Sequence, residues 1–178
     1  MNQNKPPTIL YHGSSRKIEK MLTMHRGRNP DNNLDGNQFG IYATPDWATA
    51  VVYTMGARRT TLFRPKVLDI GYSTESIHVV FRNCCWDRKA GYVYTIPADS
   101  FSRHNDFEYC SHQNVPIIES QIIMPSQIDK MVESGKLVIT QDALPNSKLL
   151  RAIYAFIDKC VHGIAAISHC YYVIRYNR

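Results

Sequence analysis

YHGSS, at residues 11–15, directly follows the apolar pair Ile9 and Leu10 near the start of the chain. Residues 8–12 predict a short strand, because β-branched and apolar residues there run into a polar and glycine-containing boundary. Gly13 at the end of that strand has no Cβ, so a ligand can approach the backbone closely. The stretch therefore predicts a strand that ends where a ligand can bind.

The segments after this strand alternate between periodic and irregular sequence. Residues 16–24 carry apolar positions at the spacing of a short amphipathic helix. Residues 25–40 break every periodicity and are rich in Gly, Asn, Asp and Pro, which predicts a functional lid. Asp46 can cap a helix that runs to about Gly56, since apolar and small residues recur there at helical spacing.

The remainder of the chain combines short strands with two further helices. Runs rich in β-branched and aromatic residues predict strands at residues 66–70, 77–81, 91–97, 115–124 and 137–140. Apolar residues at helical spacing predict helices at residues 125–134 and 145–161. We expect an α+β fold with strands in the middle and helices at both flanks.

Length and composition favour one domain. A chain of 178 residues that is 44% hydrophobic can close a single core, so we expect one domain over residues 1–178. The formal net charge of +6 favours anionic partners such as phosphate-bearing ligands. The sequence has no basic-then-apolar leader and no run of about 20 apolar residues. We expect a cytoplasmic protein without a membrane partner, or an effector exported or injected without a cleavable signal.

Cysteines and histidines predict neither a disulfide framework nor a metal site. Five cysteines are an odd number without a Cys-x-x-Cys pair, which predicts buried thiols in a reducing compartment. His162 and His169 lack a carboxylate or thiol at ligand spacing, and His112 lacks one as well. We expect no metal cofactor.

Two tyrosines and one glutamate carry the chemical prediction. Tyr42 ends a strand and Tyr53 lies near the end of the following helix, so this corner can bring both rings to one cleft. Aromatic walls suit a flat cationic ring such as the pyridinium of NAD⁺, and each contact contributes about 0.5 to 2 kcal/mol. Glu108 precedes the apolar strand at residues 115–124. A carboxylate beside a cleft stabilises an oxocarbenium-like sugar while a glycosidic bond is cleaved.

Three motifs follow one another along the chain: His12-Gly13 after a strand, Gly40-Ile41-Tyr42-Ala43 with Tyr53 eleven positions after Tyr42, and Glu108-Tyr109 before a late strand. Together they resemble the ADP-ribosyltransferase superfamily, in its His-Tyr-Glu branch of diphtheria-toxin-like and poly(ADP-ribose) polymerase-like enzymes. Residues 91–97 and 108–111 are also similar to a group of small bacterial members. The resemblance covers about residues 8–124 of the chain.

This resemblance implies a split antiparallel β-sheet core over residues 8–124 that binds NAD⁺ as a substrate, with flanking helices. A helical C-terminal extension would follow at residues 125–178. His12 would bind the adenosine ribose, with a further hydroxyl from Ser14 or Ser15. The lid at residues 25–40 would lie beside the adenosine.

The resemblance also implies how the reactive end of NAD⁺ is bound. The Gly13 backbone would hold the nicotinamide carboxamide, and Tyr42 and Tyr53 would enclose the nicotinamide ring. Glu108 would bind the 2′-hydroxyl of the nicotinamide ribose and polarise the acceptor. Ala50 stands where polymerase-like members place a serine that bonds the carboxamide, which removes one hydrogen bond worth roughly 0.5–1.5 kcal/mol.

Two features have alternative interpretations. Glu119, within the strand after Glu108, is either a salt-bridged edge residue or the catalytic carboxylate. Arg26 in the lid can neutralise a pyrophosphate or a nucleic-acid backbone. The same holds for Arg28 in the lid and for a separate basic run later in the chain, although such residues are more often solvated surface: Arg58, Arg59, Arg64 and Lys66.

The sequence therefore predicts an NAD⁺-dependent mono-ADP-ribosyltransferase with Glu108, Tyr42 and His12 as catalytic residues. It would transfer ADP-ribose to a protein or nucleic-acid acceptor and release nicotinamide, as a toxin, effector or housekeeping enzyme. Two alternatives stay open at this point. An RNA 2′-phosphotransferase-like enzyme would not need Glu108, and a non-catalytic NAD⁺ or nucleic-acid binding module would release no nicotinamide.

Overall fold

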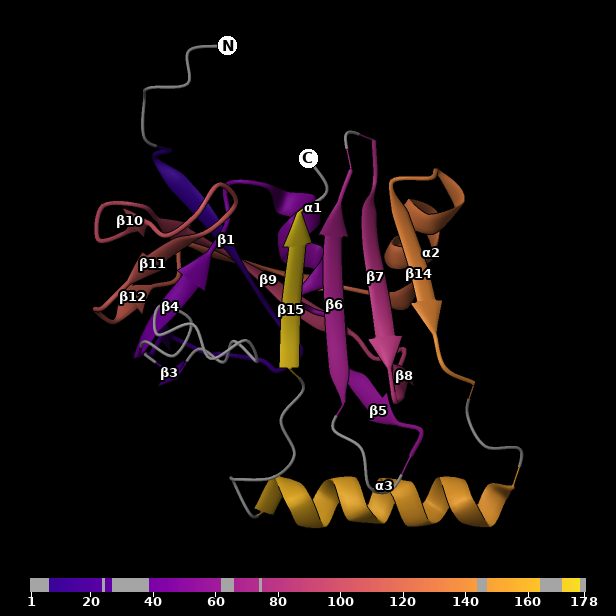
Figure 1. Cartoon of the computed structure of the whole chain (residues 1–178). Coiled ribbons are helices and arrows are strands. Elements are labelled where there is room, and N and C mark those ends of the chain that lie inside the picture. The colour runs from indigo at the N-terminus through magenta and orange to yellow at the C-terminus, as the bar shows by residue number, and fades with distance from the viewer. Residues whose placement is uncertain are drawn as a thin grey trace. The chain divides into compact units, whose positions relative to one another are not determined.

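The computed structural model describes residues 7–23, 25–26, 39–61, 66–73, 75–143, 147–163 and 171–176 (Figure 1). For residues 25–26, 39, 157–163 and 171–176 the description covers the backbone only. The chain divides into two compact units. The first combines Met1–Gly27, Asn32–Met55 and Lys89–Met124, and the second combines Arg28–Asp31, Gly56–Arg88 and Pro125–Arg178.

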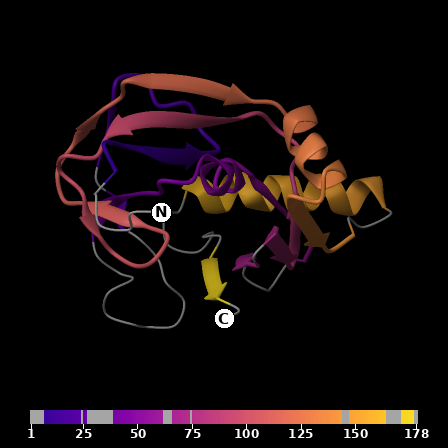
Figure 2. The ribbon, with the colours of Figure 1, turned by 90° about the horizontal axis from the view of Figure 1, so that it is seen from above.

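The first unit contains a three-stranded antiparallel sheet in the order β1-β9-β13. Its strands are β1 (Ile9–Ser14), β9 (Gly91–Pro97) and β13 (Glu119–Ile123), which lie side by side in Figure 2. The aromatic and β-branched residues of β9 suit its place between two neighbouring strands. Leu10, Tyr94 and Ile96 are completely buried and form part of the core of this unit.

A second sheet of the first unit has the order β10-β11-β4-β3. Its strands pair antiparallel and comprise β10 (Ser102–Arg103), β11 (Tyr109–Ser111), β4 (Phe39–Ala43) and β3 (His25–Arg26). A further short ladder joins β2 (Met21–Leu22) to β12 (Val115–Pro116). An isolated bridge between Tyr11 and Thr44 links β1 of the first sheet to the residue that follows β4.

Helix α1 (Trp47–Val52) follows β4 and has Asp46 as its N-cap, as the sequence predicts. The Asp46 carboxylate accepts hydrogen bonds from the backbone N–H groups of Ala48 and Thr49, at 3.3 and 2.9 Å. These N–H groups have no partner within the helix, so the cap stabilises its first turn. The helix ends earlier than predicted, with Tyr53 as its C-cap.

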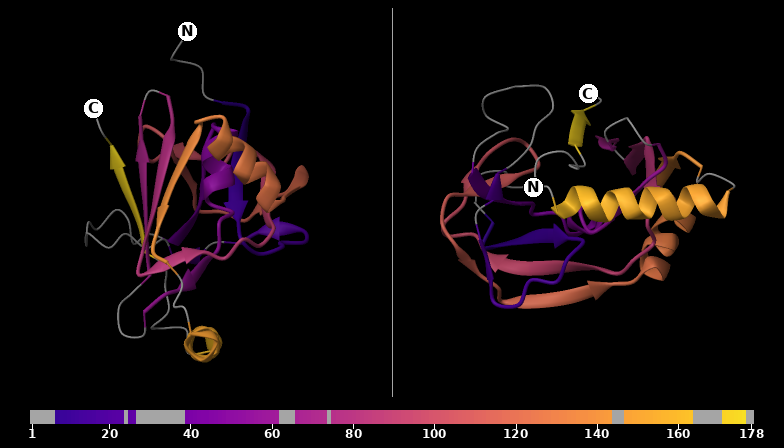
Figure 3. Two further views of the ribbon diagram at one scale, coloured as in Figure 1. Left: turned by 90° about the vertical axis from the view of Figure 1, so that its right-hand side faces the viewer. Right: turned by 90° about the horizontal axis from the view of Figure 1, so that it is seen from below.

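The second unit contains a four-stranded mixed sheet in the order β14-β7-β6-β15. β6 (Val67–Tyr72) and β7 (Ile77–Arg82) are antiparallel, whereas β14 (Leu137–Gln141) runs parallel to β7 and β15 (Tyr171–Tyr176) runs parallel to β6. β5 (Ala57–Arg59) and β8 (Cys84–Trp86) form a separate antiparallel pair. The helices of this unit are α2 (Pro125–Glu133) and α3 (Lys148–Gly163), and α3 runs across the ends of the sheet strands (Figure 3).

The fold thus combines mostly antiparallel sheets with few helices, which is compatible with the predicted α+β class. The strand predicted at residues 91–97 is present with the predicted bounds, and those predicted at residues 66–70, 77–81 and 137–140 are present with shifted ends. The strand predicted at residues 115–124 is divided into β12 and β13. The helices predicted at residues 125–134 and 145–161 correspond to α2 and α3.

The helix predicted at residues 16–24 is wrong, because the described residues 16–23 contain no helix. The backbone N–H of Ile18 donates instead to the Tyr94 hydroxyl at 2.6 Å. Leu22 is buried in the core at β2, which pairs with β12. These tertiary contacts outweigh the local periodicity, since a helix this short is marginal without packing.

The two units also group the chain differently from the predicted core at residues 8–124 and extension at residues 125–178. Residues 56–88 belong with the C-terminal part, because β6 and β7 pair with β15 and β14. In its described residues, the C-terminal part, which was expected to be helical, contributes the strands β14 and β15 as well as the helices α2 and α3. Long-range parallel pairing of this kind leaves no local signal in the sequence.

Two further observations concern the expected compartment and the thiols. Within the part of the chain that the structure describes, no helix is both long and apolar enough to cross a membrane. Cys84, Cys85 and Cys110 are buried free thiols. The side chains of Cys160 and Cys170 lie outside the described residues.

Candidate functional site

The candidate site is the edge of β1 at which the two sheets of the first unit separate. Tyr11 and Thr44 exchange two backbone hydrogen bonds, with N to O distances of 2.8 and 2.9 Å. A continued antiparallel ladder would next pair Gly13 with Tyr42, but the described residues show an isolated bridge. The N–H and C=O groups of alternate strand residues point to the same edge, so those of Gly13 point toward β4, as those of Tyr11 do.

The imidazole of His12 contacts β4, the strand with which Gly13 forms no ladder pair. Its Nδ1 lies 2.7 Å from the backbone carbonyl oxygen of Tyr42. A carbonyl oxygen only accepts hydrogen bonds, so Nδ1 carries the hydrogen and donates it. In the neutral ring Nε2 is then an acceptor. His12 therefore satisfies a carbonyl that would otherwise belong to the ladder and leaves the Gly13 edge outside it.

Helix α1 packs closely against β1 at Gly13. A Cβ at this position would overlap the carbonyl oxygen of Ala50 and lie 2.8 Å from the Cβ of Tyr53. Glycine is required for so close an approach of strand and helix. Ala50 itself is completely buried. The structure thus brings Gly13 and Tyr53, two residues of the predicted nicotinamide site, into direct contact.

Glu108 and Tyr53 also meet, although 55 residues separate them in sequence. The Tyr53 hydroxyl donates a hydrogen bond to Oε1 of Glu108 at 2.9 Å. The other carboxylate oxygen, Oε2, accepts a hydrogen bond from Nδ2 of Asn105 at 3.1 Å. Glu108 is half-buried and directly precedes β11. Both oxygens of the predicted catalytic carboxylate are therefore held by neighbouring side chains.

Tyr42 joins the same group of residues through β11. It pairs with Cys110 in the ladder between β4 and β11, and its ring lies edge-on to His104 with the centroids 5.4 Å apart. Burial and then the nearby Cys110 and Glu108 raise the pKa of the Tyr42 hydroxyl to about 12. Burial also raises the pKa of the Cys110 thiol, while its hydrogen bond with Tyr42 acts in the opposite direction. The Tyr42 phenol is therefore neutral at physiological pH.

The first unit thus brings five predicted residues together: His12, Gly13, Tyr42, Tyr53 and Glu108. They are connected by a bond from His12 to the Tyr42 backbone, by contact of Gly13 with Tyr53, and by the Tyr53 to Glu108 hydrogen bond. The enclosure of a nicotinamide between the two tyrosine rings stays a prediction.

Other predicted binding residues are less completely defined. Ser14 ends β1, and its hydroxyl accepts a hydrogen bond from the backbone N–H of Arg16 at 3.1 Å. Arg26 lies in β3, which pairs with β4, but its side chain lies outside the described part of the chain. Residues 27–38 of the predicted lid also lie outside it.

The alternative carboxylate and the basic residues have different settings. Glu119 is exposed on β13, whereas Glu108 is half-buried and contacts other predicted site residues. Arg59 and Lys66 are only 5% and 4% exposed, so these two are not part of a solvated surface. Arg58 is exposed, and Arg28 and Arg64 lie outside the described residues. Among the described residues, no group of three or more His, Cys, Asp and Glu side chains is arranged to hold a metal ion.

Sequence reasoning missed three neighbours of the predicted residues: Asn105, His104 and Cys110. Asn105 three residues before Glu108 is a recognisable turn signal, because asparagine side chains bond to backbone N–H groups two or three residues further on. The contacts of His104 and Cys110 with Tyr42 depend on the pairing of β11 with β4 and have no comparable local signal.

Comparisons of this chain with protein-family models, with curated proteins and with solved structures found no match.

Proposed function

We propose that the protein is an NAD⁺-dependent mono-ADP-ribosyltransferase with its reactive site at the Gly13 edge of β1. The observation that supports this proposal best is the hydrogen bond between Tyr53 and Glu108, beside a glycine whose backbone groups face away from the β9 ladder. A carboxylate, an aromatic ring and a strand edge outside the ladder can contact the ribose, the ring and the carboxamide of nicotinamide ribose, respectively.

The Gly13 edge is chemically complementary to the carboxamide of nicotinamide. A primary carboxamide offers a donor and an acceptor side by side, and a strand edge offers the same pair in reverse. Tyr53 packs against Gly13, and Tyr42 supplies a second, neutral phenol near the Glu108 carboxylate. Such rings attract the pyridinium cation of NAD⁺ more than they attract the neutral nicotinamide that leaves.

Two residues of the site are proposed as acceptors for the ribose hydroxyls. The Nε2 atom of His12 is an acceptor for a hydroxyl of the adenosine ribose. Glu108 is an acceptor for the 2′-hydroxyl of the nicotinamide ribose. Each carboxylate oxygen can accept two hydrogen bonds, so the ribose hydroxyl can share Oε1 with Tyr53 or displace it.

The reaction follows from this arrangement. The bond between C1′ of the ribose and the pyridinium nitrogen breaks, and both of its electrons leave with nicotinamide. Positive charge develops on the ribose, where the Glu108 carboxylate stabilises it. A lone pair on the acceptor atom then forms the new bond to C1′, and the acceptor loses a proton that Glu108 can accept. Water as the acceptor gives free ADP-ribose, which makes NAD⁺ hydrolysis a measurable partial reaction.

The test is to incubate the purified protein with NAD⁺ and to follow nicotinamide release by chromatography. We expect Glu108→Gln to lower the rate by about 10²-fold or more, because a neutral amide cannot stabilise the ribosyl cation to the same extent. Glu119→Gln is the matched control and should retain the wild-type rate, since Glu119 is exposed on β13. Equal rates for wild type and Glu108→Gln would refute the role of Glu108. Thermal stabilisation by NAD⁺ without nicotinamide release would indicate a binding module instead.

A further inference from the structure

The loop that joins β10 to β11 is closed by hydrogen bonds around Glu108. The backbone N–H groups of His104 and Asn105 both donate to the carbonyl oxygen of Glu108, at 2.9 and 3.1 Å. The side-chain oxygen Oδ1 of Asn105 accepts from the backbone N–H groups of Phe107 and Glu108, at 2.9 and 2.8 Å. Main-chain and side-chain atoms of Asn105 therefore together fix the backbone from which the Glu108 side chain extends.

The same asparagine also binds the carboxylate. Its amide nitrogen Nδ2 donates to Oε2 of Glu108 at 3.1 Å. One planar amide thus bonds the backbone of Glu108 through its oxygen and the side chain of Glu108 through its nitrogen. The Glu108 side chain, held at its backbone and at Oε2, has few rotamers left, and Tyr53 holds its other carboxylate oxygen, Oε1.

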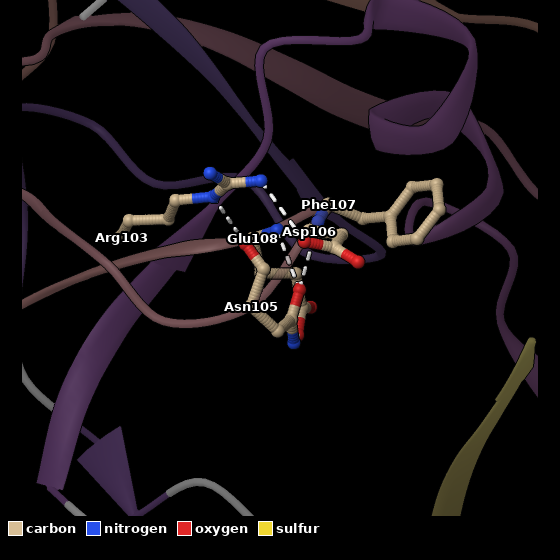
Figure 4. Close-up of polar contacts among 5 residues, drawn as sticks. All are labelled: Arg103, Asn105, Asp106, Phe107 and Glu108. Carbon is tan, nitrogen blue, oxygen red and sulfur yellow. Dashed lines mark hydrogen bonds and ion pairs between the residues drawn. The ribbon is translucent and has the colours of Figure 1, made fainter.

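The side chain of Arg103, the last residue of β10, also bonds the loop at Asn105. The Arg103 guanidinium donates from Nε to the carbonyl oxygen of Asn105 at 3.2 Å and forms a 2.9 Å ion pair with the exposed Asp106 carboxylate. Figure 4 shows these contacts and the Phe107 ring pointing away from the polar side chains. Neither Arg103 nor Asp106 bonds the Glu108 carboxylate in these contacts. Asn105 is the loop side chain that does.

We propose that Asn105 is a positioning residue that holds the Glu108 carboxylate in the orientation needed for cleavage of NAD⁺. The inference rests on the proposed function and adds to it a residue with no direct part in the chemistry. A carboxylate stabilises a developing cation best when its charged oxygens face that cation, so a carboxylate that rotates freely is less effective. The Asn105 amide limits that rotation, because it bonds one oxygen while the turn fixes the backbone.

Asn105→Asp separates the two roles of this side chain. The aspartate keeps an oxygen that accepts from the backbone N–H groups of Phe107 and Glu108, so the turn is retained. It replaces the Nδ2 donor with a second carboxylate oxygen close to Oε2 of Glu108. We expect kcat for nicotinamide release to fall by about 10- to 100-fold with little change in KM, because a charge-assisted hydrogen bond is lost. The acid limb of the pH–rate profile should move upward by about one unit or more, because two adjacent carboxylates share a proton.

Among the described residues, the side chains seen to interact with Glu108 are Tyr53, the C-cap of α1, Asn105 from its own loop, and Tyr42 and Cys110 from β4 and β11. Tyr42 and Cys110 have raised pKa values and stay neutral in the acid range, so they do not titrate in the acid limb. A shift of that limb in Asn105→Asp therefore reports on the two carboxylates.

Two further variants complete the design. Asp106→Asn changes the charge next to Asn105 without touching Glu108, and its profile should match the wild type within a few tenths of a pH unit. Asn105→Ala removes the turn as well, so we expect a larger loss of thermal stability than in Asn105→Asp. If Asn105→Asp has wild-type kcat and an unmoved acid limb, Asn105 does not position the carboxylate. If both Asn105 variants lose only thermal stability, its role is structural.

A readout without turnover separates this inference from the proposed function. The five glutamates can be labelled with ¹³C at the carboxyl, and the Glu108 signal is identified by its loss in Glu108→Gln. Asn105→Asp should move the acid titration of that signal upward whether or not the protein consumes NAD⁺. A moved titration with an inactive wild type would overturn the proposed function and leave the Asn105 contact intact. An unmoved titration would overturn the inference, whatever the activity.

Discussion

A double-mutant cycle on Tyr53 and Glu108 tests whether the site exists as the structure shows it. The Tyr53 hydroxyl donates to Oε1 of Glu108 at 2.9 Å in a half-buried setting. Hydrogen bonds to charged groups contribute about 1.5–3 kcal/mol when buried, and partial exposure places this one toward the lower end. We expect Tyr53→Phe and Glu108→Ala to show a coupling of about 1–2 kcal/mol in the free energy of unfolding.

The assay is urea unfolding of the four proteins of the cycle at pH 7. The two tryptophans lie in different units, Trp47 in the first and Trp86 in the second. A Trp86→Phe background therefore makes Trp47 fluorescence a reporter of the unit that holds the site. Tyr53→Phe combined with Glu119→Ala is the control and should be additive. Additivity of Tyr53→Phe with Glu108→Ala, within about 0.3 kcal/mol, would refute the contact and the candidate site that depends on it.

Two other consequences of the geometry can be measured without NAD⁺. Gly13→Ala should lower the free energy of unfolding by about 1–3 kcal/mol, because its Cβ would overlap the Ala50 carbonyl oxygen. In the same urea assay Ser14→Ala should cost less than about 1 kcal/mol, because it removes one exposed hydrogen bond. The pKa of Tyr42 rises from 10.0 in the unfolded chain to about 12 on folding, so its contribution to stability is complete below pH 10 and is lost as pH rises through 12. Stability measured between pH 9 and 12 should therefore fall less steeply in Tyr42→Phe than in the wild type. An identical slope in both proteins would contradict the burial of this hydroxyl.

Local signals in the sequence were sufficient to predict elements whose boundaries are set by residues nearby in the chain. Asp46 predicts α1 because a capping carboxylate and the helix it caps are adjacent in sequence. The helix expected at residues 16–24 failed because Leu22 finds a better partner surface in the core near Val115, far along the chain. The strand β15 was missed for a related reason, since its parallel pairing with β6 closes a loop of about a hundred residues and has no local signal.

The candidate site was predictable in its residue types and not in its contacts. The order of His12, Tyr42, Tyr53 and Glu108 suggested a site, but the bond between Tyr53 and Glu108 depends on how β11 pairs with β4 beside α1. Asn105 was missed because an Asn-x-x-Glu spacing reads as an ordinary turn. Its amide reaches the carboxylate as a result of the hairpin that this turn closes.

The central claim is that the Gly13 edge of β1 receives the nicotinamide of NAD⁺, and the amide signal of Gly13 tests it most directly. Of the nine glycines, Gly13 and Gly163 follow a histidine, so labelling with ¹³C-carbonyl histidine and ¹⁵N-glycine selects two amide signals. His162→Gln removes the label before Gly163 and identifies the signal of Gly13. We expect this signal to shift on titration with nicotinamide and with NAD⁺, and to shift less with ADP-ribose. A Gly13 signal that stays unchanged at saturating NAD⁺ would contradict the account.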